Sequence, residues 1–425
     1  MQSSLISVAS QKKKWTQSML NLKSRLKVVD FIRAYGESMP LLHSLADTEQ
    51  EPDWHREGNV HVHTDMVLKE AYDIIDCGEH NLNESEIRVL IFSALLHDYA
   101  KPVTTKTVVI EDVERIGAPY HEKVGASLLC HCKRPEELDA EEWHQVLQII
   151  AHHQKPKKLV KKEMGMGAYL EVFMQVKNAK LLYLLELADM RGRICEDQEM
   201  QILYQDMYYE NHMAFFGTHL LEEYLEDEKE QILLVQSDFD SDRFFLDLAL
   251  ADVRSGEIHS VTGAMRKTYA MTRPHQCVVM CGIAGAGKST YIKNRYLDHG
   301  FFVISLDEIR STIKSRCNQS NNDEVVRIAT ERLRECLRRG EDVVWDATGY
   351  RSDFRTKVLN LAKQYGAHTQ ITALIVDKDE LHSRNKKREH KVPSSVIDEQ
   401  LRKFEFPDLS EADSISWMYE GKRVY

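Results

Sequence analysis

One stretch of nine residues restricts the fold of this chain more than any other feature: Gly282-Ile283-Ala284-Gly285-Ala286-Gly287-Lys288-Ser289-Thr290. It fits the pattern G-x-x-x-x-G-K-[ST] and stands between a short apolar run and a helical pattern, which is the context the motif requires. In such a loop the backbone N–H groups and the N-terminus of the next helix face a phosphate group. The sequence therefore predicts a phosphate-binding loop between a strand and a helix.

The side chains of this loop predict a site for a nucleoside triphosphate. Lys288 is expected to bridge phosphate oxygens, and Ser289 is expected to be a ligand of Mg²⁺. ATP or another NTP with Mg²⁺ is thus the expected cofactor. The loop residues expected to bind it are Gly282, Gly285, Gly287, Lys288, Ser289 and Thr290.

From Gln276 onward, short apolar runs alternate with helical patterns. These runs are Cys277–Cys281, Phe301–Ser305, Asp342–Trp345 and Gln370–Val376. Strands that alternate with helices predict a parallel sheet. We therefore expect residues 276–425 to form an α/β domain around the phosphate-binding loop.

Two carboxylates follow apolar runs and are expected at the carboxyl ends of strands, where open α/β sheets bind ligands. Asp307 is expected to take a proton from an acceptor hydroxyl, and Arg310, three residues later on one helical face, to hold an acceptor phosphate. The alternative is an N-cap aspartate followed by a solvated arginine. Asp346 is expected to orient Mg²⁺ or its water shell.

Four further arginines are expected to contact phosphates. Arg351 and Arg355 lie one turn apart after Asp346 and are expected on the acceptor side. Arg384 and Arg388 share one face of a basic segment before Pro393, as a lid that closes on phosphates would. The alternative reading of that segment is a solvated basic helix.

These motifs resemble the polynucleotide kinase family, from the P-loop through D-x-x-R at Asp307 and Arg310 to R-x-x-x-R at Arg384 and Arg388. The resemblance covers roughly residues 276–407 and implies that Asp307 is the general base for a 5′-hydroxyl. It also implies that Arg310 holds the neighbouring phosphate, and that Lys288 and Arg388 act on the donor with Arg384. Related small-molecule kinases share much of this pattern.

The N-terminal half has a different pattern. From about Leu22 to Leu234 apolar residues recur every three or four positions, which predicts helices. We expect an all-α domain over residues 1–235 and a connector or small subdomain over residues 236–275, with a helical patch around Phe244–Val253.

An ordered set of histidines and aspartates marks the helical half as a metal site. The dipeptide His97-Asp98 ends an apolar helical stretch, and the other members of the set are His63, His121, His152, His153 and Asp189. Together they offer nitrogen and carboxylate ligands for one or two transition metals. Each histidine alone is more often a core or surface residue, and a metal-free scaffold is the alternative.

This set is similar to that of the HD phosphohydrolase superfamily over roughly residues 25–200. Trp54–Val60 and His63-Thr64 are particularly similar to the HD domains attached to tRNA nucleotidyltransferases. The resemblance implies a first metal held by His63, His97, Asp98 and Asp189, with His121 and either His152 or His153 on a second ion bridged by Asp98. It implies Mn²⁺, Ni²⁺ or Co²⁺ as cofactors.

Lys101 follows the dipeptide closely and is expected to neutralise a substrate phosphate. Ala100 stands where the HD family usually has glycine, so the sequence departs from the family pattern at this point. At such sites divalent ions activate water and polarise phosphoryl groups, so phosphoester hydrolysis is the expected chemistry. Asp98 is its expected catalytic carboxylate.

Charge and composition narrow the partners and the location. The net charge is −11, but 25 Lys and Arg stand against 22 Asp and Glu from Gln276 onward, which leaves −14 for the first 275 residues. A surface for a polyanion is therefore expected in the second half. The eight cysteines are dispersed, no long apolar run is present, and lysines 12–14 follow the apolar start of the chain. These features predict a cytoplasmic protein without a membrane partner.

Cys130-His131-Cys132 has the ligand types of half a zinc site, but no second pair follows at zinc-finger spacing, and a structural role is favoured. An HD domain followed by a polynucleotide kinase resembles the bacterial bifunctional end-healing enzymes, which prepare broken RNA for a ligase. That resemblance implies RNA or DNA ends as partners, with RNA favoured, and a polynucleotide ligase in the same pathway. The alternatives are a small-molecule kinase fused to a nucleotide phosphohydrolase, and a nucleotide-sensing RNA-binding regulator with an inactive HD scaffold.

Overall fold

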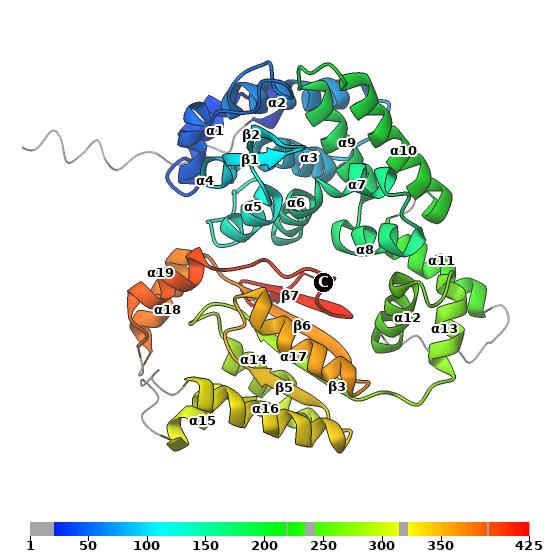
Figure 1. The fold of residues 1–425 in the computed structure, drawn as a ribbon, viewed down its shortest axis with the longest axis vertical. Helices are drawn as coiled ribbons and strands as arrows, with labels where there is room; N and C mark the ends of the chain where they lie inside the picture. The colour runs from blue at the N-terminus through cyan, green and yellow to red at the C-terminus, as the bar shows by residue number, and fades with distance from the viewer. Residues whose placement is uncertain (1–20, 218–219, 234–242, 314–321, 389–390, 425) are drawn as a thin grey trace, which may run out of the picture.

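The computed structural model describes residues 21–217, 220–233, 243–313, 322–388 and 391–424. It has a helical N-terminal part and a C-terminal part built around a sheet, stacked on one another (Figure 1). The fold class predicted from the sequence is thereby confirmed. Lysines 12–14 and Cys317 lie outside the described residues. None of the described helices has both the length and the hydropathy to cross a lipid bilayer.

Thirteen helical elements form the N-terminal part up to residue 233. They are η1 (Leu22–Ser24), α1 (Val28–Tyr35), η2 (Pro40–Asp47), α2 (Val60–Cys77), α3 (Glu84–Leu96), α4 (Lys101–Thr104), α5 (His121–Leu129), α6 (Ala140–His152), α7 (Lys155–Lys161), α8 (Met166–Val176), α9 (Ala179–Arg191), α10 (Gln198–Phe216) and α11 (Leu221–Leu233). Local capping sets several starts: Asn83 with Glu86, and Asp139 with Glu142, form capping boxes at α3 and α6.

The core of this part is formed where α3 meets α2, α6 and α9. The end of α3 is apolar around its whole circumference, and every residue from Val89 to Leu96 is buried. A helix that is apolar on all sides has to be enclosed by its neighbours. The residue that follows, His97, therefore emerges in the middle of the bundle.

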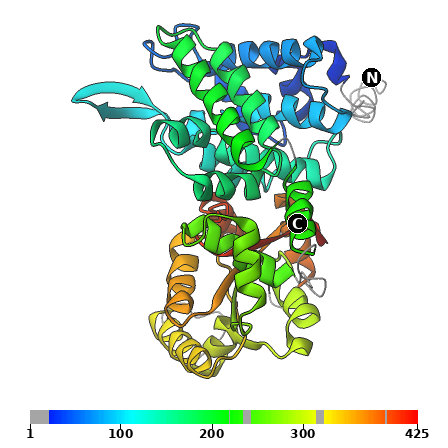
Figure 2. The same cartoon turned by 90° about the vertical axis from the view of Figure 1, so that its right-hand side faces the viewer.

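A hairpin interrupts the helices, which the all-α prediction did not include. Its strands β1 (Lys106–Ile110) and β2 (Val113–Gly117) pair antiparallel and protrude from the bundle (Figure 2). Glu111 and Asp112 both have positive φ, as a two-residue type I′ turn requires. The hairpin joins the His97-Asp98 segment to α5.

The predicted connector is a pair of packed helices. α12 (Arg243–Ser255) and α13 (Val261–Tyr269) pack on each other, and α12 also packs on α8. The helical patch expected around Phe244–Val253 lies within α12. This segment therefore extends the helical part up to the first strand of the sheet.

The C-terminal part has a six-stranded sheet of order β4-β5-β3-β6-β7-β8, parallel except for β8. The strands are β3 (Gln276–Cys281), β4 (Phe302–Ser305), β5 (Val343–Asp346), β6 (His368–Ile375), β7 (Ser414–Tyr419) and β8 (Lys422–Arg423). The helices are α14 (Lys288–Arg295), η3 (Leu297–His299), α15 (Leu306–Ile313), α16 (Asn322–Arg338), α17 (Ser352–Gln364), α18 (Lys378–Lys387) and α19 (Ser394–Arg402). The sequence predicts β3 to β6 but not β7 and β8.

The segment between α19 and β7 attaches the sheet to the helical bundle. Phe406 N donates to Ser127 Oγ (3.0 Å), and Leu409 N donates to Gln175 Oε1 (3.0 Å). Asp408, which lies between these two residues, forms an ion pair with Lys123, with 3.2 Å between Asp408 Oδ2 and Lys123 Nζ. We call residues 404–413 the docking segment.

Candidate functional site

The phosphate-binding loop lies at the carboxyl end of β3, in the middle of the sheet. Gly287 has φ 101° and is the N-cap of α14. The backbone N–H groups in the first turn of a helix have no partner within the helix, so those of α14 can face an anion. Gly349 from the loop after β5 has φ 52°, and a Cβ there would lie 2.2 Å from Met280 O. The two loops are thus in backbone contact, and Gly282 N donates to Thr348 O at 2.8 Å.

Lys288 folds back over the loop. Its Nζ donates to Gly282 O (2.8 Å) and to Ile283 O (3.2 Å). Burial lowers the pKa of Lys288 to about 8, against the opposing charge of Asp346. Burial in turn raises the pKa of Asp346, against the charge of Lys288. A bound triphosphate supplies the charge that stabilises the ammonium form.

A cleft of about 2690 Å³ opens from the loop between the helices of this part. The expected residues that line it are Gly285, Gly287, Lys288, Ser289, Thr290, Asp307, Arg310, Asp346, Arg355, Arg384 and Arg388. Asp307 is largely exposed, at 77 %, and forms an ion pair with Arg310 at the start of α15. The structure therefore brings the expected donor and acceptor groups to one cleft.

The two lid arginines differ in their positions. Arg384 lies in α18, where its Nη1 approaches Ala286 O at 3.5 Å and its Nε bonds Glu380 at 2.7 Å. Arg388 is the residue after α18 and is extended, so the two do not continue one helical face. Both reach the cleft because the basic segment turns away from the helix.

Two arginines were expected on the acceptor side, and of these only Arg355 lines the cleft. Arg351 does not line the cleft and pairs with Asp353 at 2.7 Å. Arg355 is fully buried, and its Nε and Nη2 bond both oxygens of Glu411 in the docking segment, at 2.8 and 2.7 Å. Its Nη1 donates to Gly349 O. These hydrogen bonds favour a structural role for Arg355, and acceptor binding by this residue stays a prediction.

Replacing Arg355 by alanine is expected to lower the free energy of unfolding by about 3–5 kcal/mol, since it leaves a buried carboxylate unpaired. Denaturant unfolding measures this loss. Arg351→Ala is the matched control, because its exposed pair contributes less than about 1 kcal/mol. A stable Arg355→Ala variant that only weakens acceptor binding would contradict the structural role.

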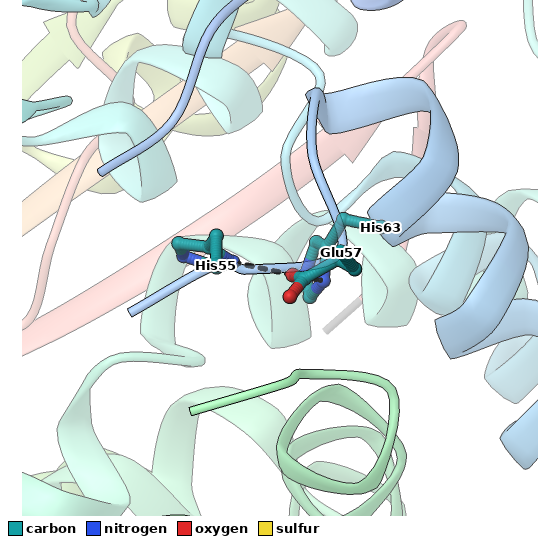
Figure 3. Close-up of side chains that lie close together, drawn as sticks. All are labelled: His55, Glu57 and His63. Carbon is teal, nitrogen blue, oxygen red and sulfur yellow. Dashed lines mark hydrogen bonds and ion pairs between the residues drawn. The ribbon is translucent and has the colours of Figure 1, made fainter. Parts of the chain in front are cut away.

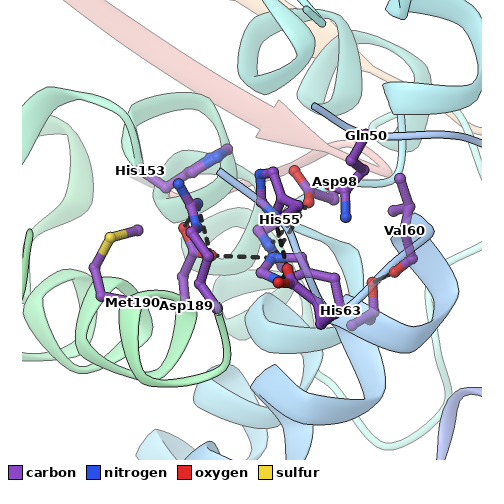
Figure 4. A network of polar contacts seen from close by, with 12 residues as sticks. Gln50, His55, Val60, His63, Asp98, His153, Asp189 and Met190 are labelled. Carbon is purple, nitrogen blue, oxygen red and sulfur yellow. Dashed lines mark hydrogen bonds and ion pairs between the residues drawn. The ribbon is translucent and has the colours of Figure 1, made fainter. Parts of the chain in front are cut away.

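The second site lies inside the helical part, where five segments bring histidines and aspartates together. His63 comes from α2, and His97 and Asp98 follow α3. His121 begins α5, and His153 caps the end of α6. Asp189 lies in the last turns of α9, and all of these side chains are buried. Figure 4 shows His63, Asp98, His153 and Asp189 within this polar network.

Asp98 is shared by two groups of ligand atoms. In each group, the atoms lie within 4.8 Å of one another: His63, His97 and Asp98 in one, and Asp98, His121 and His153 in the other. His63 Nε2 also lies 3.0 Å from Asp189 Oδ1. Two cations bridged by one carboxylate would fit this arrangement.

The histidine rings are oriented from behind by the backbone. The Nδ1 atoms of His97, His121 and His153 donate to the carbonyls of Ala94, Ala118 and Ile150 at 2.7–2.9 Å. Their Nε2 atoms therefore point inward. In metal sites, a hydrogen bond at one ring nitrogen orients the other nitrogen toward the ion. The Nε2 atoms of His121 and His153 face each other at 3.1 Å. Two lone pairs this close are stabilised by a cation, so the residues fit a metal.

The carboxylates of the cluster are held in the charged form. Burial opposes ionisation of Asp98, but the charges of His97 and Lys101 outweigh it and hold its pKa well below the ordinary range. Burial also opposes ionisation of Asp189, but Arg193 and His63 keep its pKa low. Charged carboxylates and neutral imidazoles are the ligand forms that divalent metals bind. Burial and the neighbouring His121 lower the pKa of His153.

His152 lies outside this cluster. Its Nε2 points the opposite way and lies 3.5 Å from Asp408 Oδ2 of the docking segment. Of the two adjacent histidines, the structure brings His153 to the cluster and places His152 between the two parts of the chain. The geometry therefore favours His153 over His152 as the candidate metal ligand.

Glu57 is a site residue that the sequence analysis missed. Its Oε1 accepts from His55 Nδ1 (2.7 Å) and lies 3.0 Å from His63 Nδ1; Figure 3 shows the three side chains together. Its carboxylate is fully buried, and its pKa is lowered by both imidazoles against the effect of burial. A carboxylate behind a ligating histidine fixes the ring and strengthens the ligand. The stretch Trp54–Val60 contained this signal.

Replacing Glu57 by glutamine is expected to weaken metal binding about 10- to 100-fold, because His63 loses the charge that orients it. Metal titration of the purified chain, followed by calorimetry, measures the change. Glu70→Gln on the exposed side of α2 is the matched control. Unchanged metal affinity in Glu57→Gln would show that the carboxylate only supports the fold.

Two positively charged side chains, Lys101 and Arg193, lie at the edge of the cluster. Lys101 Nζ contacts Asp98 Oδ2 (2.7 Å) and Gln50 Oε1 (2.6 Å). Arg193 Nη2 donates to both oxygens of Asp189, at 2.9 and 2.8 Å. Lys101 was expected from the sequence and Arg193 was not, although it follows Asp189 by one helical turn.

Comparison with known protein families agrees with this division of the chain. The family model for the HD domain matches residues 63–186, and the family model for the AAA domain matches residues 277–407. The first range contains the cluster residues from His63 to His153 and ends just before Asp189, and the second contains the P-loop and most of the cleft lining. These matches support an enzyme in which an HD phosphohydrolase domain is fused to a P-loop kinase-like domain.

Proposed function

We propose that this chain is a bifunctional enzyme that heals broken nucleic-acid ends, with RNA as the favoured substrate. The HD domain would remove a 2′,3′-cyclic phosphate or a terminal 2′- or 3′-phosphate. The P-loop domain would transfer the γ-phosphoryl group of an NTP to a 5′-hydroxyl. A strand cut to a cyclic phosphate and a 5′-hydroxyl carries both lesions, and a polynucleotide ligase would seal the healed ends.

The observation that carries the proposal is the size and lining of the cleft. Small-molecule pockets measure about 300–1000 Å³, and this cleft has about 2690 Å³. It continues past Asp307 and Arg310 to side chains of α16 and α17, such as Thr330 and Phe354. That is more room than a nucleotide and a nucleoside acceptor need, and it favours a polymeric acceptor.

In the kinase reaction, the oxygen of the 5′-hydroxyl would form a bond to the γ-phosphorus while the bond between the γ-phosphorus and the β-phosphate oxygen breaks. Asp307 would accept the proton of that hydroxyl. Arg310 would leave Asp307 for an acceptor phosphate. Lys288, Arg384 and Arg388 would stabilise the charge on the transferred group, and Ser289 would hold Mg²⁺.

In the HD reaction, His63, His97, Asp98 and Asp189 would hold one divalent ion, and His121 and His153 a second through Asp98. The ions would supply electrostatic activation of water and of the phosphoryl oxygen. Water opens the cyclic ester, and a second water releases inorganic phosphate. Lys101 would neutralise a phosphate of the substrate.

The test is to incubate an RNA oligonucleotide with a 5′-hydroxyl and a 2′,3′-cyclic phosphate with labelled ATP, Mg²⁺, and Mn²⁺ or Ni²⁺, and to follow each end separately. Gain of a labelled 5′-phosphate and loss of the terminal phosphate would support both halves of the proposal. Labelling of a nucleoside but not of the oligonucleotide would favour a small-molecule kinase. Nucleotide binding without transfer, by a metal-free chain, would favour a regulator.

A further inference from the structure

Helix α7 concentrates positive charge in a part of the chain that is otherwise acidic. Residues 155–162 contain five lysines, whereas the first 275 residues together carry a net charge of −14. The helix follows directly after the cluster residue His153 and packs against α10. The five are Lys155, Lys157, Lys158, Lys161 and Lys162.

Most of these lysines lack an internal counter-ion. Lys155 pairs with Glu171 at 3.6 Å, but none of the other four has an ion pair within the described part of the chain. A solvated charged helix usually places acidic residues at i+3 or i+4 positions, and this helix has none. Lys161 instead lies over the ring of Tyr204 of α10, at 5.6 Å from its centre. Unpaired cations beside an aromatic ring are typical of surfaces that bind single strands.

The positive charge of α7 lies next to the metal cluster in the chain, because Lys155 follows soon after His153. Lys157 is half-buried, and burial together with Arg193 and Lys161 lowers its pKa. Arg193 is the residue that bonds both oxygens of Asp189. Arg193 is thus already paired, and the exposed lysines Lys158, Lys161 and Lys162, which have no ion pair within the described residues, are the cations left for an external anion.

We propose that α7, with Tyr204, binds the sugar-phosphate backbone of the single strand whose 3′ end occupies the HD site. The inference rests on the proposed function and adds the surface that distinguishes a polymer from a mononucleotide. A mononucleotide would need only the cations next to the cluster. The exposed lysines Lys158, Lys161 and Lys162 would be used only by phosphates farther along a strand.

The test compares the variant K158Q/K161Q/K162Q with the wild-type chain on 3′-phosphorylated oligonucleotides of two and twelve nucleotides. We expect the KM for the longer substrate to rise about tenfold or more, and that for the dinucleotide to change less than about twofold. The salt slope of binding to the longer strand should fall by about 2, because each single-strand phosphate contact contributes about 0.7. K69Q/K133Q/K229Q, which removes three paired lysines of the same part, is the matched control.

Direct binding separates this inference from the proposed function. Fluorescence anisotropy with a 5′-blocked, 3′-hydroxyl twelve-nucleotide probe needs no turnover. Loss of probe binding in the α7 variant supports the inference even if the chain hydrolyses no terminal phosphate. Normal hydrolysis with unchanged KM and salt slope in that variant would overturn it. Equal competition by polyglutamate at matched charge would also overturn it, since the surface would then be a general polyanion site.

Discussion

Replacing Asp98 by alanine is expected to lower hydrolysis of the terminal phosphate by roughly three orders of magnitude or more, while 5′-phosphorylation stays unchanged. Asp98 belongs to both groups of ligand atoms in the helical part. Its loss should therefore reduce the content of both metal ions, which elemental analysis of the dialysed protein measures alongside each activity.

His152→Gln is the matched control for this experiment. His152 is next to the cluster residue His153 in sequence but faces Asp408. The variant should retain its metal content. A folded Asp98→Ala chain that loses both activities would argue against separate sites, and one that retains its metal would argue against Asp98 as the bridging ligand.

Replacing Asp307 by alanine is expected to lower kcat for 5′-phosphorylation by about 10²- to 10⁴-fold, the range for loss of a general base. The carboxylate is exposed in the cleft and touches only Arg310 within the described chain. Its loss should therefore change neither the stability nor the HD activity. Single-turnover transfer to a 5′-hydroxyl oligonucleotide measures the chemical step directly.

Glu308→Gln is a matched control, because this neighbouring carboxylate lines the same cleft. It should keep most of the transfer rate. An Asp307→Ala variant with unchanged kcat would shift the role of base to Asp346, the other carboxylate beside Lys288.

Local patterns predicted the elements in which neighbouring residues decide the structure. The P-loop and the strands β3 to β6 follow from glycines, apolar runs and their order in the chain. The hairpin β1–β2 was missed because its apolar residues, such as Val109 at 67 % exposure, do not face a core. Strand β7 was missed because it lies after Pro407, beyond the kinase-like motifs used to predict the sheet.

The side-chain assignments depend on the fold where packing between distant segments decides the direction of a side chain. His152 and His153 are adjacent at the end of a helix, and only the fold shows which one faces the cluster. Arg355 has the spacing of a phosphate ligand, yet Glu411, 56 residues later, neutralises it. Glu57 acts through His63, and no ligand spacing marks a residue that supports another.

The docking segment makes the two halves of this chain poor candidates for exchange as separate modules. Ser127, Gln175, Lys123 and His152 of the helical part would lose their partners if the chain were cut before Gln276. His152 is the direct neighbour of His153, so the backbone that positions a cluster residue is itself held by the other half. A shortened chain would therefore expose polar side chains that have lost their partners, and one of them, His152, is adjacent to the cluster residue His153. In related chains, inheriting the two halves together would preserve the contacts of the docking segment, whereas exchanging either half would require these contacts to form anew.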